Sequence, residues 1–243
     1  MKLICHIEDI ITKLKRRWMK LRLQPIRVLV FHQVSGTFDK TIMWPCDWNS
    51  IASFKQRILK LKDEYTFITL QDAHRHISED YIRTKKYAVL TADDGFVSIK
   101  NILLWLTEQQ IPVTLFLNPG YLTGDERPGK GVDSILSKKE IEAILEQCKP
   151  YITIASHGWT HKFCTEMSDD EFVHGVIKSE AYFQNVQEYI PFYAYPCGRH
   201  KEFQDRYLLE HNIVPVYCDG GINYNDGKRI HRECIDEGYS KEL

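Results

Sequence analysis

Residues 87–96, Tyr-Ala-Val-Leu-Thr-Ala-Asp-Asp-Gly-Phe, join a short apolar run to two adjacent carboxylates and a glycine. A run of this length that ends in turn residues predicts a buried strand. Two neighbouring carboxylates behind such a strand raise each other's pKa unless a positive charge compensates them, and a divalent cation is the obvious compensator. We therefore expect Asp93 and Asp94 to lie in a functional site at the end of this strand, although Asp-Asp-Gly is also common in ordinary turns.

Segments with the pattern of strands alternate with segments with the pattern of helices on both sides of this stretch. Short runs rich in apolar, β-branched and aromatic residues predict further strands at 26–32, 65–69, 113–118, 151–155, 192–195 and 214–218. Helices are expected at 49–62, 99–110, 138–148 and 169–185, and Ser-x-x-Glu capping boxes open the last two. This alternation predicts an α/β fold with a largely parallel sheet, either barrel-like or doubly wound, and we expect a surface loop at 118–133.

The composition suits a single domain with its own core. The chain has 243 residues, of which 43% are hydrophobic, and no low-complexity tract or long linker divides it. It has 32 basic and 33 acidic residues, so it lacks the basic excess of a nucleic-acid-binding protein, and that class is disfavoured. Seven cysteines are scattered without any C-x-x-C pair, which favours reduced, packed thiols over a disulfide framework or a zinc knuckle.

Residues 1–25 differ from the domain expected at 26–243. Their apolar residues recur at helical spacing, and six basic residues lie opposite: Lys13, Lys15, Arg16, Arg17, Lys20 and Arg22. A basic amphipathic helix of this kind can lie on an anionic membrane surface, and the alternative is a helix that packs on the domain with a solvated basic face. The segment has neither a signal-peptide pattern nor a membrane-spanning run, which favours a cytoplasmic protein with at most peripheral membrane contact.

Polar residues with catalytic potential follow the predicted strands, where ligands bind in parallel α/β folds. His32 ends the first strand, Ser-His-Gly-Trp-Thr-His at 156–161 ends another, and Tyr-Pro-Cys-Gly at 195–198 ends a third. Because His157 and His161 are four residues apart, one helical turn would present both imidazoles on the same side. Two histidines and one carboxylate make three protein ligands and leave a position for water, which is the pattern of a catalytic metal site.

Such a donor set predicts a divalent metal ion, with Zn²⁺ favoured and Co²⁺, Ni²⁺, Mn²⁺ or Fe²⁺ as alternatives. The second carboxylate would then be free to take a proton from water at the metal. Each element alone has an ordinary explanation, because histidine pairs are common in cores and on surfaces, and a histidine at a strand end is often structural. Their joint occurrence at the ends of strands favours the metal site.

Several of these motifs resemble those of the polysaccharide deacetylases, the NodB-homology family that forms family 4 of the carbohydrate esterases. Thr-Ala-Asp-Asp-Gly-Phe at 91–96 is similar to the family's T-F-D-D-G-[YF] motif, and 156–161 is similar to its S-H-[ST]-x-x-H motif. A P-A-T-F-F strand, an A-Y-P-Y-G form of the third motif and an early Y-H-x-V segment have similar sequences at 112–116, 194–198 and 30–34. Together the matches span residues 26–235.

The resemblance implies a distorted (β/α) barrel with about seven parallel strands, and it assigns roles in a hydrolase. Asp93 would be the general base, and Asp94, His157 and His161 would hold the metal. The backbone N–H of Cys197 would stabilise the oxyanion, a role in which the side chain is free to vary. A thiol nucleophile is not expected at Cys197, because no histidine partner for it is evident.

A general acid must also protonate the leaving amine, and histidine suits this task near neutral pH. In the branch of the family with the early Y-H-x-V segment, the resemblance assigns this role to His32. Many other relatives use a histidine in a late L-x-H motif, for which the imperfect match here is His231 within Arg-Ile-His-Arg at 229–232. His32 is therefore the favoured acid, and His231 is the alternative.

The sequence departs from the family pattern in three places. The third motif of many members carries an arginine that pairs with the base, whereas Ala194 occupies that position here. Arg229 and Arg199 are candidates to replace it, and the sequence alone places neither. Ala92 replaces the usual phenylalanine before the two aspartates. The late aspartate-and-tryptophan motif has no convincing match.

The sequence thus predicts a metal-dependent hydrolase that removes acetyl groups from N-acetylated sugars. Its substrate would be a polysaccharide, or a nucleotide- or lipid-linked glycan precursor of a surface polysaccharide. The alternatives are an O-acetyl esterase that acts on carbohydrate and a carbohydrate-binding relative with little turnover. The retention of Asp93 together with all three metal ligands favours an enzyme over a binding protein.

Overall fold

The computed structural model describes residues 24–36, 47–79, 83, 85–124, 134–221, 223 and 227–235. The helix expected within residues 1–25 lies outside this range, which includes only the last two residues of that segment. Every helix of the described part is too short or too polar to cross a membrane.

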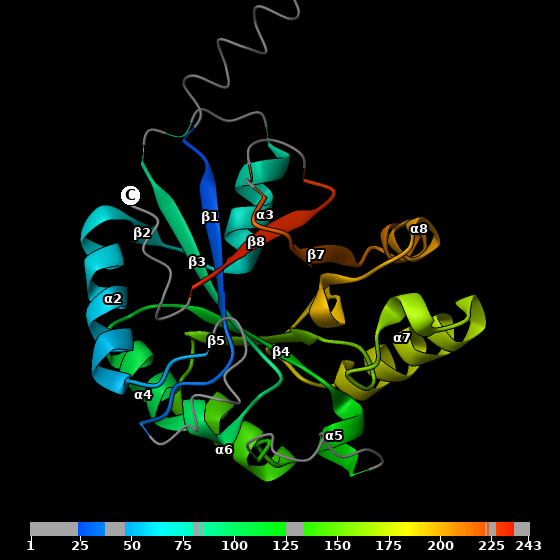
Figure 1. Cartoon of the computed structure of the whole chain (residues 1–243), viewed down its shortest axis with the longest axis horizontal. Helices are drawn as coiled ribbons and strands as arrows, with labels where there is room; N and C mark the ends of the chain where they lie inside the picture. Colours follow the sequence, from blue (N-terminus) through cyan, green and yellow to red (C-terminus); the bar gives the residue numbers. More distant parts are fainter. Residues whose placement is uncertain are drawn as a thin grey trace, which may run out of the picture.

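Seven parallel strands of the described chain close into a barrel with helices around it, as the resemblance implies (Figure 1). Their spatial order is β1, β8, β7, β6, β5, β4 and β3, and the pairing of β1 with β3 closes the ring. The short strand β2 pairs with the first residues of β3. The strands are β1 Ile26–Phe31, β2 Thr66–Phe67, β3 Tyr87–Asp93, β4 Val113–Leu117, β5 Ile152–Ser156, β6 Tyr189–Ala194, β7 Val214–Cys218 and β8 Ile230–Cys234.

The α-helices of the described chain are α2 Ile51–Glu64, α3 Leu70–Ser78, α4 Lys100–Glu108, α5 Pro119–Thr123, α6 Lys138–Gln147, α7 Asp169–Phe183 and α8 Glu202–Glu210. The four predicted helices are confirmed to within two residues at each end, whereas α3, α5, α8 and β8 were not predicted. Because α5 occupies residues 119–123, the expectation of a loop from 118 onward is wrong there.

The capping box at Ser137 forms in both directions with Glu140. Ser168 caps α7, but the Glu171 carboxylate binds Lys162 instead of closing the box.

The strand residues alternate between two apolar layers, as the pleat requires. Alternate residues such as Leu29 and Leu90 pack outward against α2 and α4. Their neighbours Val28 and Val89 belong to a cluster of inward-facing residues, here called the interior cluster, on which α3 packs. Because Val89 faces the interior, Asp93 at the end of the same strand does so as well. The alternation of side chains along β3 therefore points the Asp93 carboxylate into the barrel.

The described cysteines are not all reduced. Cys148, Cys164, Cys197 and Cys218 are free, as the sequence predicts. Cys234, the last residue of β8, is disulfide-bonded, so the expectation of reduced thiols is wrong for this residue. Sequence spacing detects only local cysteine patterns, whereas a barrel brings together segments that are far apart in the chain.

Candidate active site

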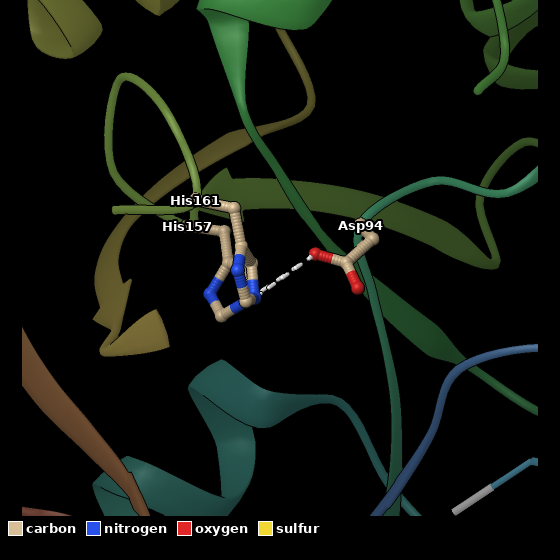
Figure 2. Close-up of side chains that lie close together, drawn as sticks. All are labelled: Asp94, His157 and His161. Atoms are coloured by element: carbon tan, nitrogen blue, oxygen red, sulfur yellow. Dashed lines mark ion pairs between the residues drawn. The ribbon is translucent and has the colours of Figure 1, made fainter. Parts of the chain in front are cut away.

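The three expected metal ligands converge at the C-terminal end of the barrel strands (Figure 2). One ligand atom from each of Asp94, His157 and His161 lies within 4.8 Å of the other two. The Oδ1 atom of Asp94 is 3.5 Å from Nε2 of His157 and 3.6 Å from Nε2 of His161. Figure 2 shows both imidazoles on the same side of this carboxylate.

A tight turn after β3 separates the two aspartates. Asp94 and Gly95 both have left-handed backbone, with φ of 67° and 73°, which is uncommon for a residue other than glycine and often marks a functional site. The turn is held by the Asp94 N–H, which donates to the Phe116 carbonyl over 3.0 Å. The left-handed φ favours glycine at position 95, and a side chain there would also come within 2.7 Å of the Leu117 side chain. Asp93 thus stays inside the barrel, and Asp94 turns toward the histidines.

The two histidines are brought together by a loop. The expectation of a helical turn from His157 to His161 is wrong, because no helix forms between β5 and residue 164. Gly158 has φ of 80° and reverses the chain, and Asn118 fixes the reversal by donating its side-chain amide to the His157 carbonyl over 2.5 Å. A side chain at Gly158 would meet the Tyr193 hydroxyl at 2.8 Å. Asn118 was not recognised as a site residue from the sequence.

Both imidazoles are neutral at neutral pH. Nδ1 of His157 lies 2.8 Å from the Ala194 carbonyl, which can only accept, so Nδ1 carries the proton and Nε2 keeps its lone pair. Burial lowers the pKa of His157 to about 3, and burial also lowers the pKa of His161. Neutral imidazoles with free lone pairs are the form that binds a metal ion.

The described neighbours of Asp94 compensate its carboxylate only in part. Its Oδ1 atom is buried without a hydrogen-bond partner among the described residues. Burial raises the pKa of Asp94 to about 7. The negative charges of Asp93 and Asp47 also raise this pKa, whereas the electrostatic interaction with His32 lowers it. An unpartnered carboxylate oxygen that faces two imidazole nitrogens is unfavourable unless a cation lies among them. The donor set of Asp94, His157 and His161 therefore fits a divalent metal ion.

Asp93 is held by an arginine that the sequence did not reveal. Arg232 of β8 donates to both carboxylate oxygens of Asp93, over 2.6 and 2.8 Å, and to the Thr91 hydroxyl over 3.2 Å. Both charged side chains are buried, with exposed fractions of 1% and 3%. Burial alone would raise the pKa of Asp93, but the charge and the hydrogen bonds of Arg232 outweigh it and hold this pKa well below the usual range. Asp93 is therefore a fixed, ionised carboxylate.

The candidates named for the missing arginine do not reach Asp93. Arg229 pairs with Asp205 over 3.4 Å, and Arg199 lies over the ring of Phe163. Neither candidate therefore replaces the missing arginine, because Arg232, in a strand that the sequence pattern does not predict, occupies that place. His231 neighbours Arg232 in β8 and so points to the opposite face of the sheet, where its Nδ1 is 2.8 Å from Asp219.

His32 and Cys197 lie at the same end of the barrel. Phe31 of β1 pairs with Ala92 of β3, so His32 stands level with Asp93. The Nδ1 atom of His32 is buried and has no hydrogen-bond partner among the described residues. Cys197 has left-handed backbone with φ of 54°, and burial together with the Asp94 charge raises the pKa of its thiol. A protonated thiol of this kind is a poor nucleophile.

A second buried carboxylate, which the sequence did not reveal, supports the segment that carries His32. Asp47 is 2% exposed, and its carboxylate accepts from the Gln33 backbone N–H over 3.3 Å and from the Gln33 side-chain amide over 3.4 Å. The Trp48 N–H donates to the Gln33 carbonyl over 2.8 Å, so backbone contacts strengthen the same junction. The residue after His32 is thus hydrogen-bonded to the segment at Asp47 and Trp48.

Comparison with known proteins places this geometry in a family. The family model "Polysaccharide deacetylase" matches residues 80–214, which include the three metal-ligand candidates, Asp93 and Cys197 but end before Arg232. A search of curated proteins gave no match. IcaB from Ammonifex degensii has the same fold, with a TM-score of 0.73 and 18% identity over 88% of this chain and 94% of that one.

Two further solved structures agree with this fold. The Streptococcus pyogenes deacetylase PplD, solved in complex with acetate, has a TM-score of 0.69 and 21% identity over 87% of this chain and 92% of that one. A de-N-acetylase from Aggregatibacter actinomycetemcomitans has a TM-score of 0.72 and 16% identity over 88% of this chain and 95% of that one. Because the family model covers more than half of the chain, including the aspartates and histidines of the site, this protein belongs to the polysaccharide deacetylase family.

Proposed function

We propose that this protein is a metal-dependent hydrolase that removes acetyl groups from N-acetylated sugars. The observation that carries the proposal is the convergence of Asp94, His157 and His161 beside an arginine-paired Asp93, in a chain of the deacetylase family. A bound divalent ion would supply Lewis acidity, which polarises the amide carbonyl and lowers the pKa of water. Zn²⁺ suits two imidazoles and one carboxylate best, and Co²⁺, Ni²⁺, Mn²⁺ or Fe²⁺ could use the same ligands.

In this mechanism Asp93 takes the proton from the attacking water. Asp94 faces the two imidazoles and belongs to the proposed metal ligands. Asp93 is outside that set, and its pairing with Arg232 keeps it ionised, so it is the carboxylate available to accept the proton. Arg232 binds both oxygens of Asp93, so it fixes the carboxylate plane as well as its charge. A base held in one orientation avoids the entropic cost of aligning it in each turnover.

His32 protonates the leaving amine, and Cys197 contributes its backbone N–H to the oxyanion. His32 is favoured over His231 because it stands level with Asp93, whereas His231 points to the outer face and pairs with Asp219. The left-handed backbone at Cys197 turns the peptide at the end of β6, next to the Ala194 carbonyl that orients His157. Backbone donors held in this way stabilise developing negative charge.

The substrate proposed here is a polysaccharide or a lipid- or nucleotide-linked glycan precursor with N-acetyl groups. The name of the Aggregatibacter neighbour, a de-N-acetylase, agrees with amide deacetylation, and the acetate in the Streptococcus structure agrees with the removal of an acetyl group. An esterase for O-acetyl groups would use the same residues, so substrate comparison has to separate the two activities.

Acetate release from matched N- and O-acetylated forms of one oligosaccharide, after loading with Zn²⁺, tests the proposal. We expect release from the N-acetylated form and its loss on treatment with a chelator. Asp93→Asn should abolish the release without lowering the metal content. Demonstrated metal binding with no release from any N-acetylated sugar would reject the proposal, and release only from the O-acetylated form would favour the esterase.

A further inference from the structure

Two loops beside the proposed reaction centre carry a cation and an aromatic ring that the hydrolysis itself does not use. The Cζ atom of Arg199 lies 4.8 Å from the centroid of the Phe163 ring. Phe163 is two residues beyond the ligand candidate His161, and Arg199 is two residues beyond Cys197. The pair therefore spans the loops that follow β5 and β6, at the end of the barrel where the proposed metal ligands lie.

Hydrogen bonds hold these two loops together independently of Arg199. Lys201 donates its ammonium group to the Met167 carbonyl over 2.6 Å, and the buried Gln204 donates to the Cys164 carbonyl over 2.7 Å. Within the second loop, the Gly198 N–H donates to the Tyr195 carbonyl over 2.9 Å. The loops that carry Phe163 and Arg199 are thus held in place before any ligand binds, which lowers the entropic cost of binding a ligand there.

Arg199 differs from Lys162 and Arg229, which each lie near a carboxylate. Lys162 binds Glu171 over 2.7 Å, and Arg229 is 3.4 Å from Asp205. For the exposed Arg199, no carboxylate of the described residues lies within ion-pair distance, and its contact there is with the face of Phe163. A guanidinium that rests on an aromatic ring keeps the N–H groups along its edge for a planar anion.

We propose that Arg199 and Phe163 form a subsite for an acidic group, a carboxylate or a phosphate, on the part of the glycan next to the acetyl group that is removed. Phe163 supports the guanidinium, and Arg199 binds the anion through paired, charge-assisted hydrogen bonds. This inference rests on the proposed function for its substrate, and it narrows that substrate to acidic glycans. The competing explanation is that the Arg199–Phe163 contact only joins the two loops.

Binding measurements separate these explanations without requiring turnover. The probes are chitotetraose, which is neutral, a hyaluronan tetrasaccharide, which carries carboxylates, and the 1-phosphate of N,N′-diacetylchitobiose. We expect Arg199→Gln to weaken binding of at least one acidic probe about five- to tenfold in isothermal titration calorimetry, and chitotetraose less than twofold. Arg199→Lys, which keeps the charge but loses the planar fork, should lose less than Arg199→Gln.

Lys162→Gln is the matched control, because it removes one exposed positive charge from the same rim and should leave all affinities within twofold. An effect on only one acidic probe supports the subsite and identifies its anion. Equal weakening of neutral and acidic probes by Arg199→Gln, or no weakening at all, would overturn the subsite. Acetate release from chitotetraose by the wild-type protein reports on the proposed function separately.

Discussion

Replacement of Arg232 by methionine perturbs the contact on which the proposed base depends. The variant leaves the Asp93 carboxylate inside the barrel without its bidentate partner, whereas methionine fills part of the volume beside the Phe116 ring, over which the Arg232 guanidinium lies. Removal of one member of a buried ion pair costs about 3–5 kcal/mol, because the remaining charge is neither solvated nor paired. We expect a loss of this size in the free energy of unfolding at pH 7.

The loss should depend on pH with a definite sign. In the wild-type protein the pKa of Asp93 is depressed, so its contribution to stability is present above the unfolded value of about 3.9 and is lost as pH falls through the folded value. In Arg232→Met the burial remains, and it raises the folded pKa of Asp93. The contribution of the protonated Asp93 to the stability of the variant is then lost as pH rises through that raised value. The difference in the free energy of unfolding between the two proteins should therefore shrink from pH 7 to pH 5.

Urea unfolding at both pH values, in the presence of a chelator, measures these free energies for the wild-type protein, Arg232→Met, Asp93→Asn and the double variant. The double variant has no buried charge at this position, so it should be more stable than Arg232→Met at pH 7. A loss below about 1 kcal/mol in Arg232→Met would show that Asp93 does not depend on the pair. A double variant as unstable as Arg232→Met would attribute the loss to packing instead.

Three further outcomes are expected. His161→Ala should lower the metal content after dialysis, as measured by plasma mass spectrometry, and full occupancy would contradict its assignment as a ligand. His32→Gln should reduce kcat for acetate release by about 10²- to 10⁴-fold with unchanged metal content, because it removes the proposed acid; an unaltered kcat would transfer that role to another group. Ser137→Ala should lower the free energy of unfolding by about 1 kcal/mol through loss of the capping box with Glu140, with kcat unchanged, and an unaltered urea midpoint would show that the cap is not stabilising.

Local patterns predicted those parts of the barrel whose strands are apolar. β3 is buried on both faces and reads as a continuous apolar run, so its polar ending was conspicuous. β8, in contrast, has the sequence Ile-His-Arg-Glu-Cys, and each of its charged residues finds its partner elsewhere in the chain. Arg232 binds Asp93, and Glu233 binds Arg27 of β1 over 2.6 Å. The strand is stabilised by these long-range contacts, which no sequence window contains.

The missed helices have different causes. In α3, Leu70, Ala73 and Ile77 recur at helical spacing behind a Thr69 cap, so the signal was present and could have been used. α8 buries polar residues, because its Asp205 accepts from the hydroxyls of Tyr195, the residue after β6, and of Tyr217 in β7. Its amphipathic pattern is therefore weak, and the partners of its buried carboxylate lie outside the helix, in β7 and just after β6.

The position of Arg232 also explains Ala194. The family's third motif places the arginine on the strand that is β6 here, but Ala194 is fully buried in the interior cluster, and its carbonyl orients His157. An arginine at 194 would compete for the barrel interior that Arg232 occupies from β8, so the two solutions exclude each other. The strand that carries Arg232, β8, also completes the ring between β7 and β1. Asp93 on β3 therefore receives its counter-ion from a strand that joins the ring beside β1, and an opening between β8 and β1 would separate Arg232 from Asp93.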